Sequence, residues 1–432
     1  MSFEDANDIL AKLNPLCCMG KVKNIAGMMI EATGLSANVG DICMIHDPIE
    51  EKTIMSEVIG FKNSNLLLMA YGDIKGIGLG SLVESTKSKL RVPVGEFLIG
   101  RTIDATGCPI DGLGEFDVKE YYNVDSTYTN PLERPRISTR LSFGIKAIDG
   151  MMTIGKGQRM GIFAGSGVGK STLMGMIAKN IKTDINVIAL VGERGREVTE
   201  FIEKDLGKEG LARSVLVVAT SDQPAMYRVK CATVATAIAE YFKDRGKDVL
   251  LMMDSLTRFA MAQREIGLAA GEPPIARGYT PSIYSELPKL LERSGNFKEG
   301  SITGIYTVLV EGDDTNEPIS DTVRGIIDGH IVLTRSLAHK NHYPAIDVNA
   351  SISRLMTDIV TDEHKQAAAK VRDLLSVYYQ NYDLISIGAY KPGMNHKLDE
   401  AIKKIDAVNA FLCQKVNENF SFDDTLKLME EL

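Results

Sequence analysis

The segment from Ala164 to Ser171, which reads Ala-Gly-Ser-Gly-Val-Gly-Lys-Ser, restricts the fold of this chain more than any other feature. It directly follows the apolar run Met160–Phe163 and precedes a helical pattern that begins near Thr172. Its three glycines permit backbone torsions that other residues resist, so that successive N–H groups point inward at an anion. The helix that follows adds the positive end of its dipole. In this strand–loop–helix context the segment predicts a phosphate-binding loop rather than a chance glycine-rich turn.

The side chains of the loop indicate which ligand it binds. We expect Lys170 to reach the β- and γ-phosphates, and the Ser171 hydroxyl to be a ligand of Mg²⁺. The expected cofactors are therefore ATP and Mg²⁺. The residues expected to contact the nucleotide here are Gly165, Ser166, Gly167, Val168, Gly169, Lys170, Ser171 and Thr172.

The chain around this loop alternates apolar runs with helical stretches. The runs are Met160–Phe163, Val187–Val191, Val215–Ala219, Val249–Met253, Ile305–Val310 and Ile331–Leu333. Continuous apolar strands between helices are typical of a parallel sheet that is covered on both faces. Because such sheets bind ligands at the carboxyl ends of their strands, the polar residues that follow each run are candidate site residues.

Asp254 is the first of these candidates. It ends an apolar strand that begins at Asp248, so its carboxylate lies where an acidic residue can hold the Mg²⁺ shell. The alternative is a structural role in which Asp254 caps the following turn.

Glu193 is the second candidate, because a carboxylate after Val187–Val191 is placed to polarise an attacking water. Position alone leaves Glu197 and Glu311 as alternatives for this general base. Arg194, the next residue, is expected to contact a phosphate or a neighbouring carboxylate.

The chain has 432 residues, more than the roughly 250–300 residues at which a single core stops growing. Changes in its residue pattern divide it into four parts. Residues 1–19 carry an apolar stripe at helical spacing and are expected to form an amphipathic helix. Residues 20–92 show short β-type runs broken by glycines, which predicts a small β-barrel. Residues 93–361 hold the α/β nucleotide-binding domain, and residues 362–432 a helical domain.

Composition excludes several other classes. A net charge of −8 disfavours nucleic-acid binding, which usually goes with a basic excess. The longest apolar run, Leu66–Tyr71, is much shorter than the about 20 residues of a membrane span, and the acidic amino terminus does not resemble a signal peptide. The six cysteines are scattered without metal-ligand spacing, which favours a reducing, cytoplasmic compartment.

Further motifs occur outside the phosphate loop: Gly-Glu-Arg-Gly-Arg-Glu at 192–197, Asp-Ser-Leu-Thr-Arg at 254–258, and Pro-Ala-Ile-Asp at 344–347 with two serines further on. These motifs resemble the catalytic chains of the rotary-ATPase superfamily. Gly-Tyr-Thr-Pro-Ser at 278–282, the segment 306–314 and Gly-Ala-Tyr at 388–390 are similar to its type III secretion branch, and most to flagellar export ATPases. Over residues 20–415 the resemblance implies a RecA-like P-loop core, an N-terminal β-barrel and a C-terminal helical domain.

The resemblance also implies roles for the catalytic residues. Glu193 is similar to the glutamate that activates water, and Arg194 and Arg258 are similar to arginines that surround the γ-phosphate within the same chain. Arg354 is similar to the arginine finger that reaches the γ-phosphate of the neighbouring subunit. Because Lys170 and Arg354 then act on one nucleotide from two chains, we expect hydrolysis to be slow in a monomer and to increase on assembly.

Two tyrosines complete the implied nucleotide site. Tyr343 is similar to the aromatic residue that stacks on adenine, for which a flat ring is well suited. Tyr390 is expected either to close the other side of the adenine pocket or simply to pack.

The function implied by the family is ATP hydrolysis by a homohexameric ring that supports type III protein export, releasing and unfolding substrates held by chaperones. The implied partners are a stator-like regulator bound by the N-terminal helix, a coiled-coil stalk protein in the ring's central opening, chaperone–substrate complexes and the export gate. The implied location is cytoplasmic and peripheral to the inner membrane, with no span.

Four alternatives remain at this point. Injectisome service is possible in place of flagellar service. A β-type rotary synthase subunit is disfavoured, because Tyr379–Gly388 replaces the strongly acidic loop of those subunits. An RNA-stimulated helicase is disfavoured by the acidic charge and the lack of tryptophan. An inactive scaffold conflicts with the intact set Lys170, Glu193, Asp254 and Arg354.

Overall fold

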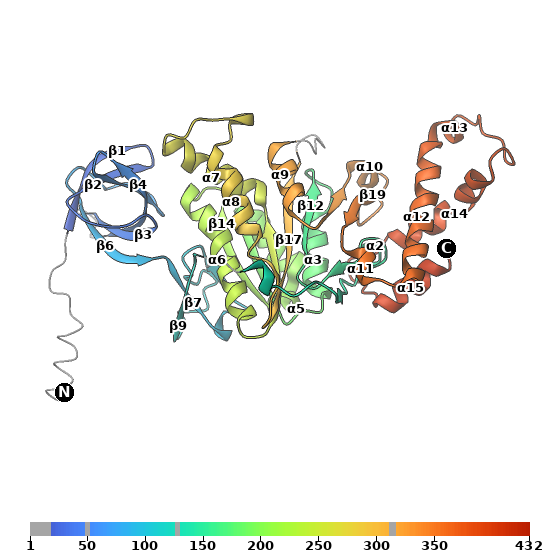
Figure 1. Ribbon diagram of the computed structural model, residues 1–432, viewed down its shortest axis with the longest axis horizontal. Coiled ribbons are helices and arrows are strands. Elements are labelled where there is room, and N and C mark those ends of the chain that lie inside the picture. The colour runs from blue at the N-terminus through green and yellow to red at the C-terminus, as the bar shows by residue number, and fades with distance from the viewer. Residues whose placement is uncertain (1–18, 48–51, 126–129, 311–316) are drawn as a thin grey trace.

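Figure 1 shows the computed structural model, which describes residues 19–47, 52–125, 130–310 and 317–432. Three regions follow one another along its longest axis: a β-barrel, an α/β core and a group of helices at the carboxyl end. Residues 1–18 of the expected N-terminal helix, and the alternative base Glu311, lie outside the described residues.

The barrel is closed by six antiparallel strands in the order β1-β2-β5-β4-β3-β6. Their inward-facing side chains, among them Ile30, Ile45 and Leu68, are fully buried. The β-barrel expected from the sequence is thereby confirmed. The strands are β1 (Met19–Ala26), β2 (Met29–Thr33), β3 (Asp41–His46), β4 (Thr53–Lys62), β5 (Asn65–Ala70) and β6 (Leu82–Lys89).

The α/β core is built on a nine-stranded sheet in which neighbouring strands follow the order β19-β18-β12-β17-β15-β13-β14-β8, with β16 paired to β17. All pairs are parallel except β18–β19 and β16–β17. The strands are β8 (Thr102–Asp104), β12 (Arg159–Ala164), β13 (Ile185–Glu193), β14 (Ser214–Thr220), β15 (Asp248–Asp254), β16 (Gly295–Asn296), β17 (Ser301–Leu309), β18 (Gly329–Leu333) and β19 (Ile346–Ser353). Each of the six apolar runs in the sequence overlaps one of these strands, so the parallel sheet is confirmed.

Strand β13 shows why those runs are apolar at every position. All nine of its residues are buried. Val187 and Val191 belong to the core on one side of the sheet, and Ile188 and Leu190 to the core on the other side. Because side chains alternate between the faces of a strand, both faces must be covered by helices, and burial of each large apolar side chain contributes about 1.5–3 kcal/mol.

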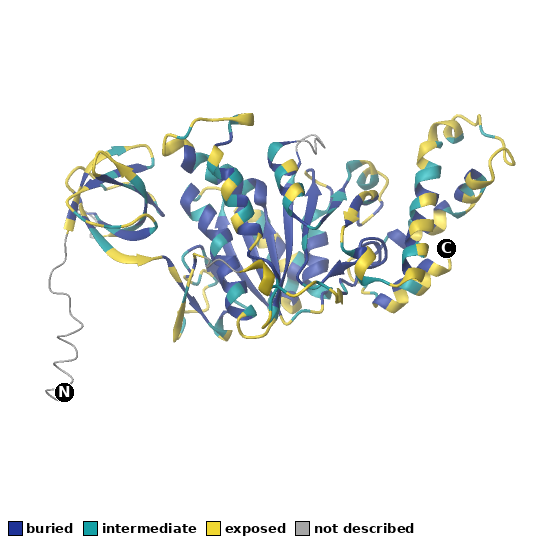
Figure 2. Cartoon of the chain, in the orientation of Figure 1, coloured by how far each residue is buried: buried dark blue, intermediate teal, exposed yellow. Residues whose placement is uncertain are grey.

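Helices cover both faces of the sheet (Figures 1 and 2). On one side lie α6 (Ala225–Lys243), α7 (Leu256–Ala269), α8 (Pro281–Leu291) and α9 (Pro318–Ile326), which share a core with Val187. On the other side lies α3 (Lys170–Asn180), which shares a core with Ile188. The shorter elements of the core are β7 (Arg91–Val94), β9 (Glu120–Asn123), β10 (Arg140–Leu141), α2 (Lys146–Met151), β11 (Ile154–Gly155), α4 (Gly195–Glu200), a π-helix (Phe201–Leu206), α5 (Gly207–Leu211), α10 (Arg335–His339) and α11 (Met356–Ile359), with 3₁₀ turns at Glu96–Leu98, Pro131–Glu133 and Ala276–Gly278.

The carboxyl end is helical, as expected from its amphipathic pattern. It consists of α12 (Asp362–Gln380), α13 (Tyr382–Ser386), α14 (His396–Leu412) and α15 (Phe422–Glu430). Val371 of α12 and Val408 of α14 are buried in the same core as α3, so these helices are packed onto the α3 side of the sheet. The tip around α13 is exposed (Figure 2). None of the helices in the described part combines the length and the apolar character needed to cross a membrane.

Candidate active site

The expected phosphate loop lies between β12 and α3, at the carboxyl edge of the sheet. Gly167 and Gly169 have φ angles of 77° and 86°, in the left-handed region where a residue with a Cβ atom is strained. Gly169 is also the N-cap residue of α3, so the helix begins at Lys170 with its first N–H groups at the loop. Two of the three glycines thus have the torsions that the sequence predicts.

Lys170 joins the loop to two buried carboxylates that come from separate strands. Its Nζ forms an ion pair with Asp254, at the end of β15, and lies 3.8 Å from Oε1 of Glu193, at the end of β13. The two carboxylates are only 5–7% exposed. They are close together because β13 and β15 are neighbours and parallel, so their carboxyl ends meet at one edge.

Thr307 is a site residue that the sequence analysis missed. Its hydroxyl donates a hydrogen bond of 2.6 Å to Oδ1 of Asp254, and its side chain is fully buried. It lies on β17, which runs between β12 and β15 and therefore ends beside the phosphate loop. The available signal was a hydroxyl in the middle of the apolar run Ile305–Val310.

Glu193 has the environment of a group whose proton affinity is altered. Burial, reinforced by the negative charge of Asp254, raises the pKa of the Glu193 carboxyl to about 7, and the Lys170 ammonium offsets only part of that rise. Its buried Oε1 accepts no hydrogen bond from the described residues. Glu197 differs, because its side chain is 39% exposed and is paired with Arg194 at 3.5 Å.

These groups surround a cavity of about 400 Å³. Arg194 and Arg258 also line it, and the buried Nε of Arg258 has no hydrogen-bond partner within the described chain. Of the loop residues, Val168 is the exception, because its side chain is 1% exposed in the core and only its backbone is left to face a ligand. The cavity is lined by Gly165, Ser166, Gly167, Gly169, Lys170, Ser171, Thr172, Leu190, Glu193, Arg194, Glu197, Val198, Phe201, Asp254, Arg258 and Leu309.

A second cavity, of about 720 Å³, adjoins the first and shares Gly169 and Thr172 with it. Tyr343 lines this cavity beside Gly169, where an added Cβ would be 3.5 Å from its ring. The cavity is also lined by the end of α14 and the chain beyond it, where Gln414 donates its backbone N–H to the Tyr343 carbonyl at 2.9 Å. The side chain of Phe420 also lines it. The phosphate loop lines the first cavity and the second is mostly apolar, so the two together can take the phosphates and the base of one nucleotide.

Two of the expected residues are not brought to these cavities. Tyr390 lines neither of them, and its hydroxyl hydrogen-bonds Asp399 at 2.9 Å and the Asn395 carbonyl at 3.1 Å. Arg354 follows β19, is exposed, and donates to the Arg324 carbonyl at 3.2 Å. A position of Arg354 outside the phosphate cavity of its own chain is what its expected role toward a neighbouring subunit requires.

The fold and the site define a P-loop nucleotide-binding protein of the α/β type. Family models match the chain in three segments: the ATP synthase alpha/beta family β-barrel domain at 22–87, the nucleotide-binding domain of the same family at 144–353, and the C-terminal domain of the type III secretion ATPase EscN at 360–431. The chain belongs to the ATP synthase alpha/beta family.

Individual relatives specify its branch. The chain is 56% identical to the flagellum-specific ATP synthase of Bacillus subtilis (strain 168), over 96% of this chain and 94% of that protein. Two solved structures of the assembled ATPase EscN, from the type III secretion system of enteropathogenic E. coli, match at 44% identity over 95% of this chain and 99% of theirs. Their TM-scores are 0.90 for EscN alone and 0.88 for EscN in complex with its central stalk EscO. The protein is an ATPase of the flagellar and type III secretion branch.

Proposed function

We propose that this chain hydrolyses ATP as a ring of six copies, in which each nucleotide is bound by one chain and completed by Arg354 of the next. The observation that carries the proposal is the division of the site. Lys170, Glu193 and Asp254 surround one cavity, whereas Arg354 lies outside it on an exposed part of the same chain. Rings built from one repeated head-to-tail contact join two such surfaces at every interface.

Within each chain, the loop from Gly165 to Thr172 holds the phosphates, and Lys170 contacts the β- and γ-phosphates. Glu193 positions the attacking water, because its Oε1 is buried and free to accept a hydrogen bond from it. Arg194 and Arg258 contact the γ-phosphate from the same chain. Arg354 of the neighbouring chain stabilises the charge that develops on the transferred phosphoryl group.

The donor set suits Mg²⁺ bound with ATP. No group of three or more histidine, cysteine, aspartate or glutamate side chains forms a metal cage in the described residues. Mg²⁺ takes few protein ligands besides phosphate oxygens and water, and the Ser171 hydroxyl with the Asp254 carboxylate supplies such a pair. The ion neutralises phosphate charge when it is bound; Lys170 and Thr307 keep Asp254 in place for it.

The base of the nucleotide occupies the second cavity, stacked on Tyr343. Tyr390 has two alternative roles, as in the sequence analysis. Its hydrogen bonds to Asp399 and Asn395 support a local role in the turn between α13 and α14, unless it contacts adenine in the assembled ring.

The ring serves type III protein export, with the flagellar apparatus as first choice and an injectisome as the alternative. It releases substrates from chaperones and unfolds or loads them at the export gate. The solved complex of EscN with its central stalk EscO supports a coiled-coil stalk partner in the ring opening. We assign the binding of the stator-like regulator to residues 1–19, where the sequence predicts a helix, and the location to the cytoplasmic side of the inner membrane. The domain division at 20–92, 93–361 and 362–432 belongs to the same proposal.

A subunit-mixing experiment tests the division of the site. Lys170→Ala and Arg354→Ala chains, each inactive alone, are mixed before assembly, and ATP hydrolysis is measured together with ring formation. When subunits mix at random, about one quarter of the interfaces join an intact Lys170 to an intact Arg354, so activity returns. Assembled mixed rings with no activity above either variant alone would remove the proposed role of Arg354.

A further inference from the structure

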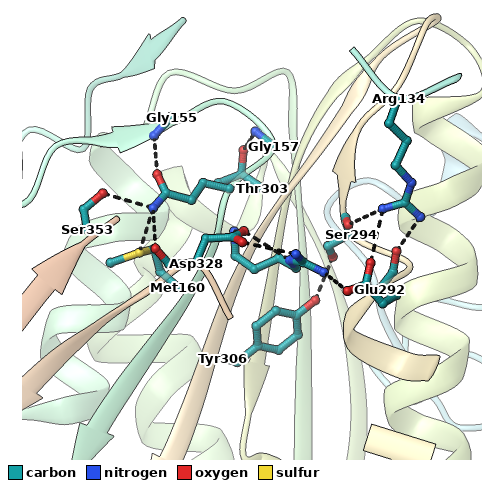
Figure 3. Close-up of polar contacts among 12 residues, drawn as sticks. Arg134, Gly155, Gly157, Met160, Glu292, Ser294, Thr303, Tyr306, Asp328 and Ser353 are labelled. Atoms are coloured by element: carbon teal, nitrogen blue, oxygen red, sulfur yellow. Dashed lines mark hydrogen bonds and ion pairs between the residues drawn. The ribbon is translucent and has the colours of Figure 1, made fainter. Parts of the chain in front are cut away.

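Gln158 and its surroundings form a buried polar cluster that the nucleotide site does not use. Gln158 is the residue before β12, at the edge of the sheet opposite the phosphate loop, and it is fully buried. Its Oε1 accepts the Gly155 N–H at 2.8 Å. Its Nε2 donates to the Asp328 carbonyl at 3.2 Å and to the Ser353 hydroxyl at 3.0 Å (Figure 3).

Both acceptors lie at the base of Arg354. Ser353 is its neighbour in the chain, and its hydroxyl is held a second time because it donates to the Thr153 carbonyl at 2.8 Å. The Asp328 carbonyl that receives the Gln158 amide also receives the backbone N–H of Arg354 at 3.0 Å. The Gln158 side chain thus fixes the Asp328 carbonyl, which is the hydrogen-bond acceptor for the backbone N–H of Arg354.

The side chain of Asp328 fixes that residue from the other direction. Its carboxylate accepts three hydrogen bonds from Arg159, from the backbone N–H at 3.0 Å and from Nε and Nη2 at 3.1 Å each. The same guanidinium forms an ion pair with Glu292, and Arg134 donates to the Glu292 carbonyl at 2.6 Å (Figure 3). The Arg159 and Asp328 side chains are 16% and 25% exposed, so their contact is largely shielded from water, whereas the Glu292 side chain is 55% exposed.

We infer that Gln158, supported by the Arg159–Asp328 pair, is a positioning residue for Arg354: it sets the point from which this arginine reaches the nucleotide of the neighbouring chain. The inference rests on the proposed role of Arg354. The Arg354 side chain is exposed in its own chain, and its guanidinium donates to the Arg324 carbonyl at 3.2 Å. Because that bond must break when the guanidinium reaches a neighbouring chain, the backbone anchor determines the distance that the side chain has to span. Because an arginine in trans must meet a phosphate within hydrogen-bond distance, a small displacement of the anchor is costly in rate.

The test variant is Gln158→Met, which keeps the length of the side chain and removes its donor and acceptor. We expect folded rings with an unchanged KM for ATP and a kcat lowered about 10- to 100-fold, the cost of a displacement of about 1 Å at a catalytic contact. Asp328→Asn is the second variant, and it weakens the Arg159 contact while leaving Gln158 in place. Asp328→Asn should also leave the KM for ATP unchanged and lower kcat, by a smaller factor than Gln158→Met.

Subunit mixing separates positioning from a general defect in folding. Gln158→Met chains mixed with Lys170→Ala chains should recover activity, because the Lys170→Ala subunit supplies a correctly anchored Arg354 to the intact phosphate loop of the Gln158→Met subunit. The same chains mixed with Arg354→Ala chains should recover nothing, since neither partner then carries a correctly placed arginine.

Asn186 offers a matched control on β13. Like Gln158, it is a fully buried amide that donates to a backbone carbonyl and a serine hydroxyl, at 2.9 Å from Ala178 and 3.4 Å from Ser214. Activity lost by Asn186→Leu should not return on mixing with Lys170→Ala chains, because Asn186 bonds Ala178 of α3, the helix that begins at the phosphate loop of the same chain.

Two outcomes would overturn the inference about Gln158, and a third would also overturn the proposed role of Arg354. The first outcome is folded Gln158→Met rings with a normal kcat. The second is a loss of kcat in Gln158→Met that mixing with Lys170→Ala chains does not relieve, although the same mixing relieves the loss in Arg354→Ala. Either outcome would show that Gln158 does not position Arg354. If Arg354→Ala itself is not relieved in mixed rings, the proposed trans arginine fails and the inference falls with it.

Discussion

Lys170 and Arg354 carry the same charge and lie in the same α/β core, but their surroundings differ. The Lys170 side chain is 13% exposed, and its ammonium meets the carboxylates of Asp254 and Glu193. Arg354 is exposed and donates to a backbone carbonyl. Its backbone, in contrast, is held by the Asp328 carbonyl beside the fully buried Gln158.

The difference indicates where each charge acts. A cation that acts within its own chain is neutralised there by carboxylates, which keeps the buried charge tolerable without a ligand. A cation that acts on another chain, as proposed for Arg354, keeps its side chain at the surface and is held mainly through its backbone. The comparison therefore predicts two classes of variant, those that a neighbouring subunit can relieve and those that it cannot.

The largest effect is expected for Arg354→Ala. Removal of an arginine supplied in trans costs about 10³–10⁵ in kcat in other phosphoryl-transfer enzymes. Rings should still assemble and bind nucleotide, because the loop and Lys170 are unchanged. Steady-state hydrolysis at saturating ATP, with binding of a fluorescent nucleotide, measures both. A large loss of nucleotide binding would indicate that Arg354 belongs, like Lys170, to the nucleotide site of its own chain and does not act on the neighbouring chain.

Glu193→Gln should lower kcat about 10²–10⁴-fold, the usual range for loss of a general base, with nucleotide binding retained. Mixing with Lys170→Ala chains should restore nothing, because both residues belong to the same site. Glu200→Gln is the control and should keep the activity, since Glu200 is 56% exposed, is paired with Arg196 and is not among the residues that line the cavity. Recovery on mixing would contradict the assignment of Glu193 to its own chain's nucleotide.

Tyr343→Ala should raise KM for ATP about 5- to 150-fold, because stacking of a base on an aromatic ring is worth about 1–3 kcal/mol. Little change in kcat is expected, since Tyr343 lines the base end of the site. Tyr343→Phe preserves the ring and should behave like the unmodified protein. A fall in kcat with constant KM would be evidence against stacking.

The smallest effect is expected for Thr307→Val, which keeps the shape of the side chain and removes its hydrogen bond to Asp254. The loss of one hydrogen bond to a charged group is worth about 1.5 kcal/mol at the lower end of its range, or about tenfold, and the lower end applies because Lys170 still pairs with Asp254. We expect the Mg²⁺ concentration for half-maximal hydrolysis to rise by about that factor. Ser301→Ala is a control, because its hydroxyl bonds Asp248 at the opposite end of the sheet. An equal rise in this Mg²⁺ concentration for Thr307→Val and Ser301→Ala would mean that Thr307 stabilises the fold and has no specific effect on Asp254.

The sequence was sufficient for the sheet and for one side of the site. A strand buried on both faces must be apolar throughout, so the runs mark the strands and the next polar residue marks the carboxyl edge. Asp254 and Glu193 were found in this way, and the glycine pattern located the loop. The resemblance to known catalytic chains supplied the roles of Tyr343 and Arg354.

The order of strands was not predictable in the same way, and the residues that depend on it were missed. Thr307 reaches Asp254 because β17 enters between β12 and β15, although these strands are far apart in the sequence. Gln158 reaches Asp328 across 170 positions. Such contacts leave no local periodicity, so a single sequence shows the polar residue but not its partner.

The wall of the base cavity has a mechanical consequence. The backbone of Gln414 is bonded to Tyr343, and its amide donates to the Gly144 carbonyl and accepts the Lys146 N–H. The chain at the end of α14 is thereby hydrogen-bonded to the segment 144–146 of the α/β core. Any tilt of α14 toward or away from the sheet changes the width of this cavity, to which the proposed function assigns the base. Under the proposed function, a displacement of the exposed tip around α13 and the release of the product nucleotide are therefore linked through α14.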